Sequence, residues 1–420
     1  MLQTRALGIL FSTLFLLMLG VGIIIPNLAY HAQEHQAGAF QITQLFTLYS
    51  LMQFLFAPLW GHLSDRVGRK PVLVAGLVGN ALGLLLFGVG ETLPVLFLAR
   101  GLSGLMSSAA LPTAMAYVAD VTDDRSRGRG MGLLGAAMGL GFIFGPVLGG
   151  ILSLYGHGVP FHVAGALNLV TAALAAALLR ESLPARGTAH PTPRPRLREA
   201  FSGPLLPFFM VAFFVTFAMA SLESIFPLFI QDRFGYGAQD MGIMFLFMGA
   251  AVVLMQAFAL GRVIHRFGEE TVLAWGLLIN ALGFALVIAA GGRASLTVAL
   301  VVGGVGNQIM RPTNASLITK RTRHGQGASI GLMDAFDSAG RILGPIAAGL
   351  LYGPDPRFPY MASAGILTVV AVVLWIRKGT RPDPAVAAAA MAGGAMPGTE
   401  ALPEPAPIPP EPGPAPWGSV

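Results

Sequence analysis

Long apolar runs separated by short polar segments dominate the pattern of this chain. Twelve such runs lie at residues 6–30, 41–60, 72–90, 94–118, 130–154, 160–180, 206–230, 239–260, 272–290, 295–318, 327–352 and 358–376. Each run is close to or above the ~20 residues that a helix needs to cross the hydrocarbon core of a bilayer. The first run is too long for a signal peptide and lacks a small-residue cleavage site, so we interpret it as a retained helix. The pattern predicts an all-α integral membrane protein with twelve transmembrane helices.

The basic residues between the runs alternate from side to side. Of the 26 Lys and Arg, 20 fall in segments on the side of the N-terminus, whereas only Arg233, Arg293 and Arg357 fall on the other side. Because Lys and Arg accumulate in cytoplasmic loops, this asymmetry predicts a multi-pass protein of the cell membrane with both termini in the cytoplasm.

Composition narrows the class of protein. Hydrophobic residues make up 54% of the chain and charged residues 11%, against about 25% charged residues in soluble domains. The absence of Cys excludes disulfides and thiolate ligands. No metal-ligand cluster and no phosphate-binding loop stands out, so we expect no metal and no cofactor. The net charge of +6 is accounted for by the cytoplasmic face, so we expect the lipid bilayer rather than nucleic acid as partner.

The chain also repeats itself with an offset of about 200 residues. GHLSDRVGRKPVL at 61–73 matches GRVIHRFGEETVL at 261–273, and Asn-Ala-Leu-Gly recurs at 80–83 and 280–283. The repeat predicts two pseudo-symmetric six-helix bundles, residues 1–180 and 204–376. A cytoplasmic linker at 181–203 and a disordered cytoplasmic tail at 377–420 complete the expected organisation. Duplicated bundles of this kind are typical of secondary transporters with a substrate site between the halves.

The loop between the second and third runs holds Gly61, Asp65, Arg66, Gly68 and Arg69. Topology alone would require the basic residues but neither the aspartate nor the glycines, which permit a tight turn and close helix approach. We expect Asp120, at the end of the fourth span, to pair with the arginine at position 69 and to latch one conformational state.

Glycines also form a stripe in the fifth span. Gly141, Gly145 and Gly149 follow each other at i, i+4 and i+8, which gives a smooth face for close backbone packing. Pro146 is expected to bend this helix. Ordinary small-residue packing is one interpretation; the functional one is that the two halves meet here and seal the pathway.

These motifs together resemble those of the major facilitator superfamily. The loop at 61–71, the Leu-Gly…Pro pattern at 19–26, the Arg-Gly-Leu-Ser-Gly segment at 100–104 and the Gly-rich segment at 141–150 are similar to the motifs of its drug:proton antiporters. Leu-Glu…Pro at 222–227 and Arg-Pro at 311–312 resemble bacterial multidrug and quinolone exporters of the NorA type, with tetracycline exporters nearby. The resemblance implies the major facilitator fold and export coupled to protons.

Glu223 is the strongest single candidate for proton coupling. It lies within the seventh run, and an intramembrane carboxylate is costly unless it faces a cavity or a partner. Apolar surroundings favour the uncharged acid, so this group could load and release a proton. The competing interpretation is a protonated glutamate that only bonds a neighbouring helix.

A second charged group is expected in spans ten and eleven. Asp334, Asp337 and Arg341 share one helical face at i, i+3 and i+7, and the last two could pair within the helix. Arg311 lies at the same depth as Asp334, so we expect these two to pair. The network is either a structural lock or a part of proton coupling. The resemblance implies a carboxylate in span ten near the arginine, as several relatives have, and the corresponding place in this chain holds Gln308.

We expect Arg100, in the fourth span, to be a buried cation, and its half of the chain offers it no acidic partner. The resemblance implies that it bonds backbone carbonyls of the first span and contributes to proton movement. Candidates for the wall of the substrate cavity are the polar or aromatic span residues Asn27, Gln53, Gln256, Asn307, Gln308 and Phe226. Each polar one is also suited to bonding between helices.

The sequence therefore predicts a monomeric, proton-coupled exporter of small amphipathic compounds, cationic or zwitterionic. A sugar or metabolite efflux carrier of the same fold is the first alternative. A membrane scaffold or receptor built on an inactive transporter fold is the second, and a membrane-embedded enzyme is the least supported.

Overall fold

The computed structural model describes residues 2–122, 124–182, 205–322 and 326–379, and these residues are almost entirely helical. The first half of the chain forms α1 (Leu2–Glu34), α2 (Ala39–Val67), α3 (Arg69–Val89), α4 (Leu93–Ser107), α5 (Ala110–Val121), α6 (Asp124–Leu152), η1 (Ser153–Tyr155) and α7 (Val159–Leu178). The second half forms α9 (Leu206–Phe234), α10 (Ala238–Leu254), η2 (Met255–Ala259), α11 (Leu260–Phe267), α12 (Glu269–Ala289), α13 (Arg293–Arg321), α14 (Gln326–Tyr352) and α15 (Phe358–Gly379).

All twelve predicted runs coincide with helical segments. In the described part of the chain, ten segments are long and apolar enough to cross a membrane. The other two are α13 and α14, which carry the charged residues predicted for spans ten and eleven. The predicted fold class, an all-α membrane protein of twelve helices, is therefore confirmed.

Two of the predicted spans are not continuous α-helices. The fourth breaks into α4 and α5 at Ser108 and Ala109. Pro112 explains the break, because it has no N–H to bond the Ser108 carbonyl one turn before it. The eighth span contains η2, a π-helical turn that joins α10 to α11 and includes Gln256. Such turns are often found at functional positions in α-helices.

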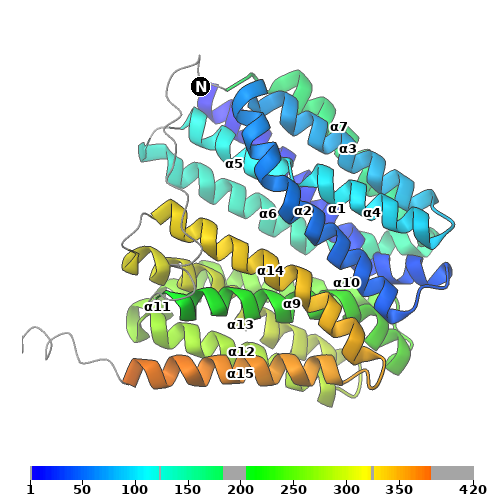
Figure 1. Cartoon of the computed structure of the whole chain (residues 1–420), viewed down its shortest axis with the longest axis vertical. Helices are drawn as coiled ribbons and strands as arrows, with labels where there is room; N and C mark the ends of the chain where they lie inside the picture. The colour runs from blue at the N-terminus through cyan, green and yellow to red at the C-terminus, as the bar shows by residue number, and fades with distance from the viewer. Residues whose placement is uncertain (1, 123, 183–204, 323–325, 380–420) are drawn as a thin grey trace, which may run out of the picture. The chain divides into compact units, whose positions relative to one another are not determined.

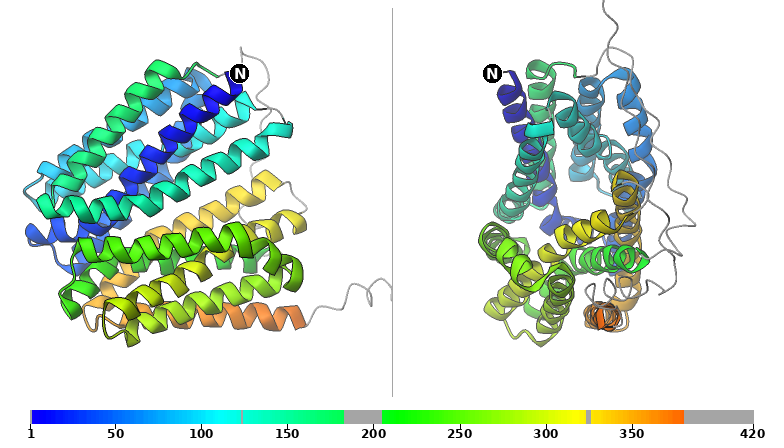
Figure 2. Two further views of the ribbon diagram at one scale, coloured as in Figure 1. Left: turned by 180° about the vertical axis from the view of Figure 1, so that it is seen from behind. Right: turned by 90° about the vertical axis from the view of Figure 1, so that its left-hand side faces the viewer.

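The helices form two groups that follow the order of the repeat. Figure 1 shows α1 to α7 on one side and α9 to α15 on the other, and Figure 2 shows the same division from two further directions. Within the groups, α1 packs along α6 and α9 along α14. Between the groups, α2 packs against α14 and α6 against α10. Both interfaces therefore pair one helix from each half of the repeat.

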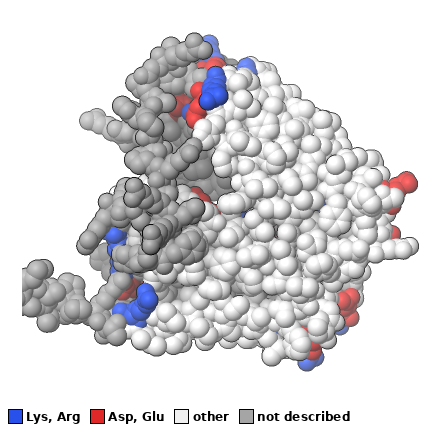
Figure 3. All heavy atoms as spheres, in the orientation of Figure 1, with Lys and Arg blue, Asp and Glu red and all other residues white. Residues whose placement is uncertain are grey.

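The specific contacts between the two groups lie toward one end of the helices. The Tyr30 hydroxyl lies 3.2 Å from the carbonyl oxygens of Pro227 and Tyr236. Close to this end, Gly349 packs on Phe40 and Thr43 of α2. The charged side chains visible in Figure 3 gather at the two ends of the helices and leave a broad uncharged band between them. This distribution is the one expected when lipid tails surround the middle of the helices.

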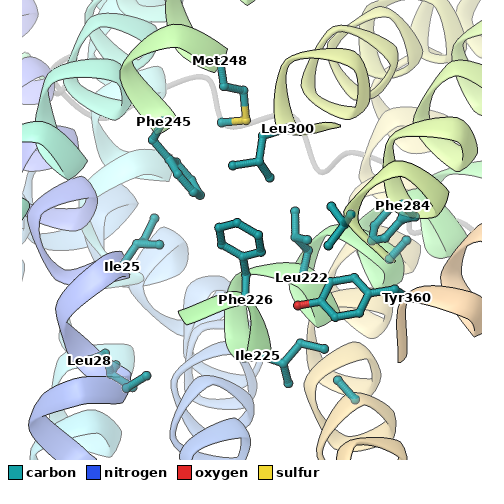
Figure 4. Packing of buried hydrophobic residues seen from close by; sticks show 14 of the residues in the cluster. Ile25, Leu28, Leu222, Ile225, Phe226, Phe245, Met248, Phe284, Leu300 and Tyr360 are labelled. Atoms are coloured by element: carbon teal, nitrogen blue, oxygen red, sulfur yellow. The ribbon is translucent and has the colours of Figure 1, made fainter. Parts of the chain in front are cut away.

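A large hydrophobic core fills the second group and reaches into the first. Phe226 lies at its centre with no exposed surface, and its ring centroid is 6.5 Å from that of Phe245. Figure 4 shows this ring enclosed by side chains from several helices, Ile25 of α1 among its neighbours. The prediction that Phe226 lines the substrate cavity is therefore wrong, because neighbouring side chains surround its ring completely.

The described residues up to Ile376 form one compact unit. Of the predicted linker, only Glu181 and Ser182 belong to the described residues. Of the predicted tail, residues 380–420 also lie outside them. The exact division into bundles, linker and tail stays a prediction.

Candidate functional site

A cavity of about 710 Å³, its open mouth included, lies between the two groups of helices. Its walls are mainly apolar: Val21, Ile24, Ile25, Leu28, Phe46, Leu84 and Phe142. The polar lining consists of Tyr49, Ser50, Asn80, Arg100, Glu223 and Arg341. The first half of the repeat contributes the apolar wall and one arginine, and the second half contributes the carboxylate and the other arginine.

Glu223 is thus placed in the cavity and not on the outer surface. It lies on α9, in the segment that forms the hydrophobic core around Phe226. Among the residues that the structure describes, none donates a hydrogen bond to its carboxylate. Arg341 on α14 is close enough to interact with it electrostatically. The carboxylate therefore faces the cavity without a hydrogen-bond donor from the described part of the chain.

Arg100 is buried against α2. Its Nε donates a hydrogen bond to the Leu45 carbonyl oxygen at 3.4 Å, and its guanidinium carbon lies 4.2 Å from the ring centroid of Tyr49. The expected bond to a carbonyl of the first span is wrong, since the carbonyl belongs to the second. A cation over an aromatic face is stabilised by the ring's quadrupole, which compensates in part for the missing carboxylate.

The charged residues of spans ten and eleven form one small network, with Arg311 bridging two carboxylates. Its Nη2 lies 3.3 Å from Asp334 and 3.8 Å from Asp337. The Thr216 hydroxyl of α9 donates a bond of 2.7 Å to Asp337. The predicted Arg311–Asp334 pair is confirmed. The predicted pair within α14 is wrong, because Asp337 turns to α9 and α13 while Arg341 lines the cavity.

The glycine stripe of α6 packs within its own half. A Cβ atom at Gly145 would lie 2.5 Å from the Gly22 Cα of α1, and Gly141 and Gly149 also face α1. The prediction that the stripe joins the two halves is therefore wrong. Its neighbours make that contact instead: Pro146 lies against Gly242 of α10, and Gly150 against Ala238.

At the turn between α2 and α3, Arg69 pairs with both Asp65 and Asp120. The predicted Arg69–Asp120 pair is present at 3.1 Å, with both side chains mostly buried. Gly68 adopts a φ of 122°, which few side chains tolerate. Glu181 occupies the space beside it and accepts the backbone N–H groups of residues 69 and 70. The arginine and both aspartates lie in the first half of the repeat, and Glu181 follows it as the first residue of the predicted linker.

Two other residues predicted for this loop, Gly61 and Arg66, take no part in the cluster around Arg69 in this structure. No atom lies within 4 Å of the place where Gly61 would carry a Cβ, so close packing does not explain that glycine. Arg66 is exposed, and no described residue forms an ion pair with it.

The second half repeats the Arg69–Asp120 pair with its charges exchanged. Glu269, at the start of α12, accepts bonds from Lys320 at 2.8 Å and Ser316 at 2.6 Å. Positions 269 and 320 follow 69 and 120 by 200 residues each. Sequence reasoning missed this pair. Comparing positions 69 and 120 with the positions 200 residues further along would have found it, because both pairs of positions carry opposite charges.

Most of the remaining polar candidates form hydrogen bonds, either to another helix or within their own helix. Asn27 is fully buried and donates to the Ile23 carbonyl of α1 at 2.7 Å, so it does not line the cavity. Gln53 donates to the Tyr49 hydroxyl at 3.1 Å and to Ser107 of α4 at 3.2 Å. Gln256 of η2 donates a bond of 3.5 Å to Gln308. Asn307 is the exception, because its buried Oδ1 has no donor among the residues that the structure describes.

Comparisons with known proteins bear on this arrangement. The profile of the family described as Major Facilitator Superfamily matches residues 10–262 and 243–419. Multidrug resistance protein 1 of Bacillus subtilis is 30% identical over 369 residues, which cover 86% of this chain and 94% of that protein. Quinolone resistance protein NorA of Staphylococcus aureus is 25% identical, over 90% of this chain and 98% of its own length.

Solved structures show the same fold at lower identity. The human organic anion transporter MFSD10 has a TM-score of 0.64 and 22% identity, covering 89% of this chain and 99% of that one. A bacterial homologue of the lysosomal transporter Spinster, in an inward-facing and occupied conformation, has a TM-score of 0.72 and 15% identity. It covers 90% of this chain and 97% of its own.

Proposed function

This chain belongs to the Major Facilitator Superfamily and is a multi-pass membrane transporter, and we propose that it exports small amphipathic compounds in exchange for protons. The proposal rests on the position of Glu223. Its carboxylate lies in a largely apolar cavity between the halves, and no described residue donates a hydrogen bond to it. The relatives named for multidrug and quinolone resistance support the same substrate class.

The chemistry of the cavity suits a zwitterion better than a simple cation. With its carboxylate ionised, the cavity holds one negative and two positive side chains, Glu223 against Arg100 and Arg341. An amine of the substrate would pair with the carboxylate and an acidic group with a guanidinium, while aromatic and aliphatic walls bury the remainder. A polar sugar would leave most of these apolar walls without favourable contacts, so a sugar carrier fits less well.

Protonation of Glu223 would release the substrate. A proton that arrives from outside removes the negative charge and weakens the hold on the amine. Loss of that proton to the cytoplasm restores the binding site. The membrane potential contributes ~2.3 kcal/mol per charge per 100 mV to such a cycle. A ligand shifts the equilibrium between two conformations only by the difference between its affinities for them. Coupling therefore works only if the substrate and the proton favour different conformations.

The two halves would rock about the cavity to expose it to each side in turn. In the proposed orientation, with the N-terminus in the cytoplasm, the contacts around Tyr30 and Gly349 lie on the outer side. These contacts would close the outer end, and the cavity would open inward.

Export from pump-deficient bacteria tests this function. Cells that express the chain should accumulate less quinolone, tetracycline and ethidium than control cells, and a protonophore should abolish the difference. Glu223→Gln should still bind these compounds but lose uphill export. The matched control, Glu91→Gln, makes the same chemical change in the exposed connection between α3 and α4 and should keep full activity. Protonophore-sensitive export that survives in Glu223→Gln would contradict the proposed role of this carboxylate.

A further inference from the structure

A cluster of metal-ligating side chains lies at the end of α1, separate from the cavity. His31 and Glu34 lie at i and i+3 in the last turn of α1, and His35 follows directly in the turn after the helix. Their ligand atoms lie within 4.8 Å of one another. No metal was expected from the sequence, so this grouping departs from that expectation.

The imidazole of His31 is oriented as in a metal site. Its Nε2 lies 3.0 Å from the Phe87 carbonyl oxygen and must donate its proton there. The side chain is 5% exposed, and its Nδ1 has no hydrogen-bond partner among the described residues. A backbone carbonyl that holds one ring nitrogen while the other carries a lone pair is the usual outer-shell arrangement of a metal-binding histidine.

The lone pair of His31 faces another acceptor. Its Nδ1 lies 3.4 Å from Oε2 of Glu34, and two acceptors at this distance repel unless a proton or a cation lies between them. Ligands at ~2.0–2.1 Å from a tetrahedral ion lie roughly 3.4 Å apart, which equals this separation. The ligand atoms of all three residues lie within 4.8 Å of one another, so the His35 ring would need to move by at most about 1.4 Å to reach the same separation.

The carboxylate is also held in place from a second segment. The His157 Nδ1, in the connection between η1 and α7, donates a hydrogen bond of 2.7 Å to Oε1 of Glu34. This bond leaves Oε2 directed toward His31. It also links the end of α1 to a connection that is 123 residues away in sequence.

We propose that His31, Glu34 and His35 bind a divalent transition-metal ion, with Zn²⁺ as the best match, and that His157 positions the carboxylate. Two imidazoles and one carboxylate suit Zn²⁺ and its first-row neighbours, whereas Mg²⁺ and Ca²⁺ prefer oxygen ligands. A water molecule would fill the fourth position. The site does not depend on the exporter function, because none of its residues lines the cavity.

Calorimetric titration of the purified full-length chain, without a histidine tag, with Zn²⁺ alone tests the site. The wild type should bind one ion at saturation. Glu34→Gln and His35→Ala should weaken binding at least 10-fold, and His157→Ala by roughly 10-fold, as removal of an outer-shell partner does. The control His265→Ala, which removes an exposed histidine of α11, should bind as the wild type does.

A substitution at position 35 gives an independent readout. The chain has no cysteine, so His35→Cys would carry its only thiol and should show a thiolate-to-metal absorption band with Co²⁺. No saturable Zn²⁺ binding, or binding that His35→Ala leaves unchanged, would overturn the proposal. In that case a proton lies between His31 and Glu34, and the two form a simple ion pair.

Discussion

Replacing Gly145 by alanine should separate α1 from α6 and destabilise the first bundle. The new Cβ would lie 2.5 Å from the Gly22 Cα and 2.8 Å from the Leu19 carbonyl oxygen, both backbone atoms that no rotamer change can move. Carbon atoms pack best at about 3.5–4.0 Å, so the helices must move apart by about 1 Å. Overpacking of this kind costs up to about 3 kcal/mol, and the better helix propensity of alanine returns about 1 kcal/mol.

The same helix offers a matched control. Gly139 is exposed, and a Cβ added to it would have no atom within 4 Å. Gly139→Ala should therefore gain about 1 kcal/mol from propensity alone, so the two variants should differ by about 3 kcal/mol. Heating the detergent-solubilised protein and following the monodisperse fraction by size-exclusion chromatography measures this difference. The Gly145→Ala midpoint should fall roughly 2–3 °C below that of the wild type. Equal stability of Gly145→Ala and Gly139→Ala would refute the close contact between α1 and α6.

Three further predictions use the same measurement of thermal stability. Phe226→Ala empties the centre of the core and should cost about 3–5 kcal/mol; a loss below about 1 kcal/mol would mean that the ring is not enclosed. Asp120→Asn breaks a pair whose side chains are 12% and 16% exposed, so its cost should exceed the ~1 kcal/mol of an exposed pair. Arg69→Ala should cost at least as much, because it also removes the pair with Asp65. Asp337→Asn should destabilise more than Asp334→Asn, because the first side chain is 16% exposed and the second 52%; the reverse order would contradict the network described here.

The fold was accessible from sequence because its signals are long and redundant. Twelve apolar runs, one asymmetry of basic residues and one internal repeat all require the same architecture. Ion pairs were also predictable where depth and charge sign both constrained them, as for Arg311 with Asp334 and Arg69 with Asp120. Opposite charges at equal depth in a membrane have few other partners to choose from.

The walls of the cavity were less predictable. An apolar or amide side chain in a membrane span can face lipid, another helix or the cavity, and periodicity does not distinguish these environments. For that reason the sequence predicts Phe226 and Asn27 in the wall of the cavity, whereas both are fully buried in the structure. The glycine stripe failed for a related reason: its spacing identifies a close contact but not the partner helix, which proved to be α1.

The exchanged charges of Arg69–Asp120 and Glu269–Lys320 bear on how a duplicated chain assembles. Since both halves have the same order of helices, a segment of one could dock into the place of its counterpart while the chain enters the bilayer. Such a crossed arrangement would set Arg69 against Lys320 and Glu269 against Asp120. Like charges would then repel at both positions, so each bundle discriminates against the other's helices by charge sign alone.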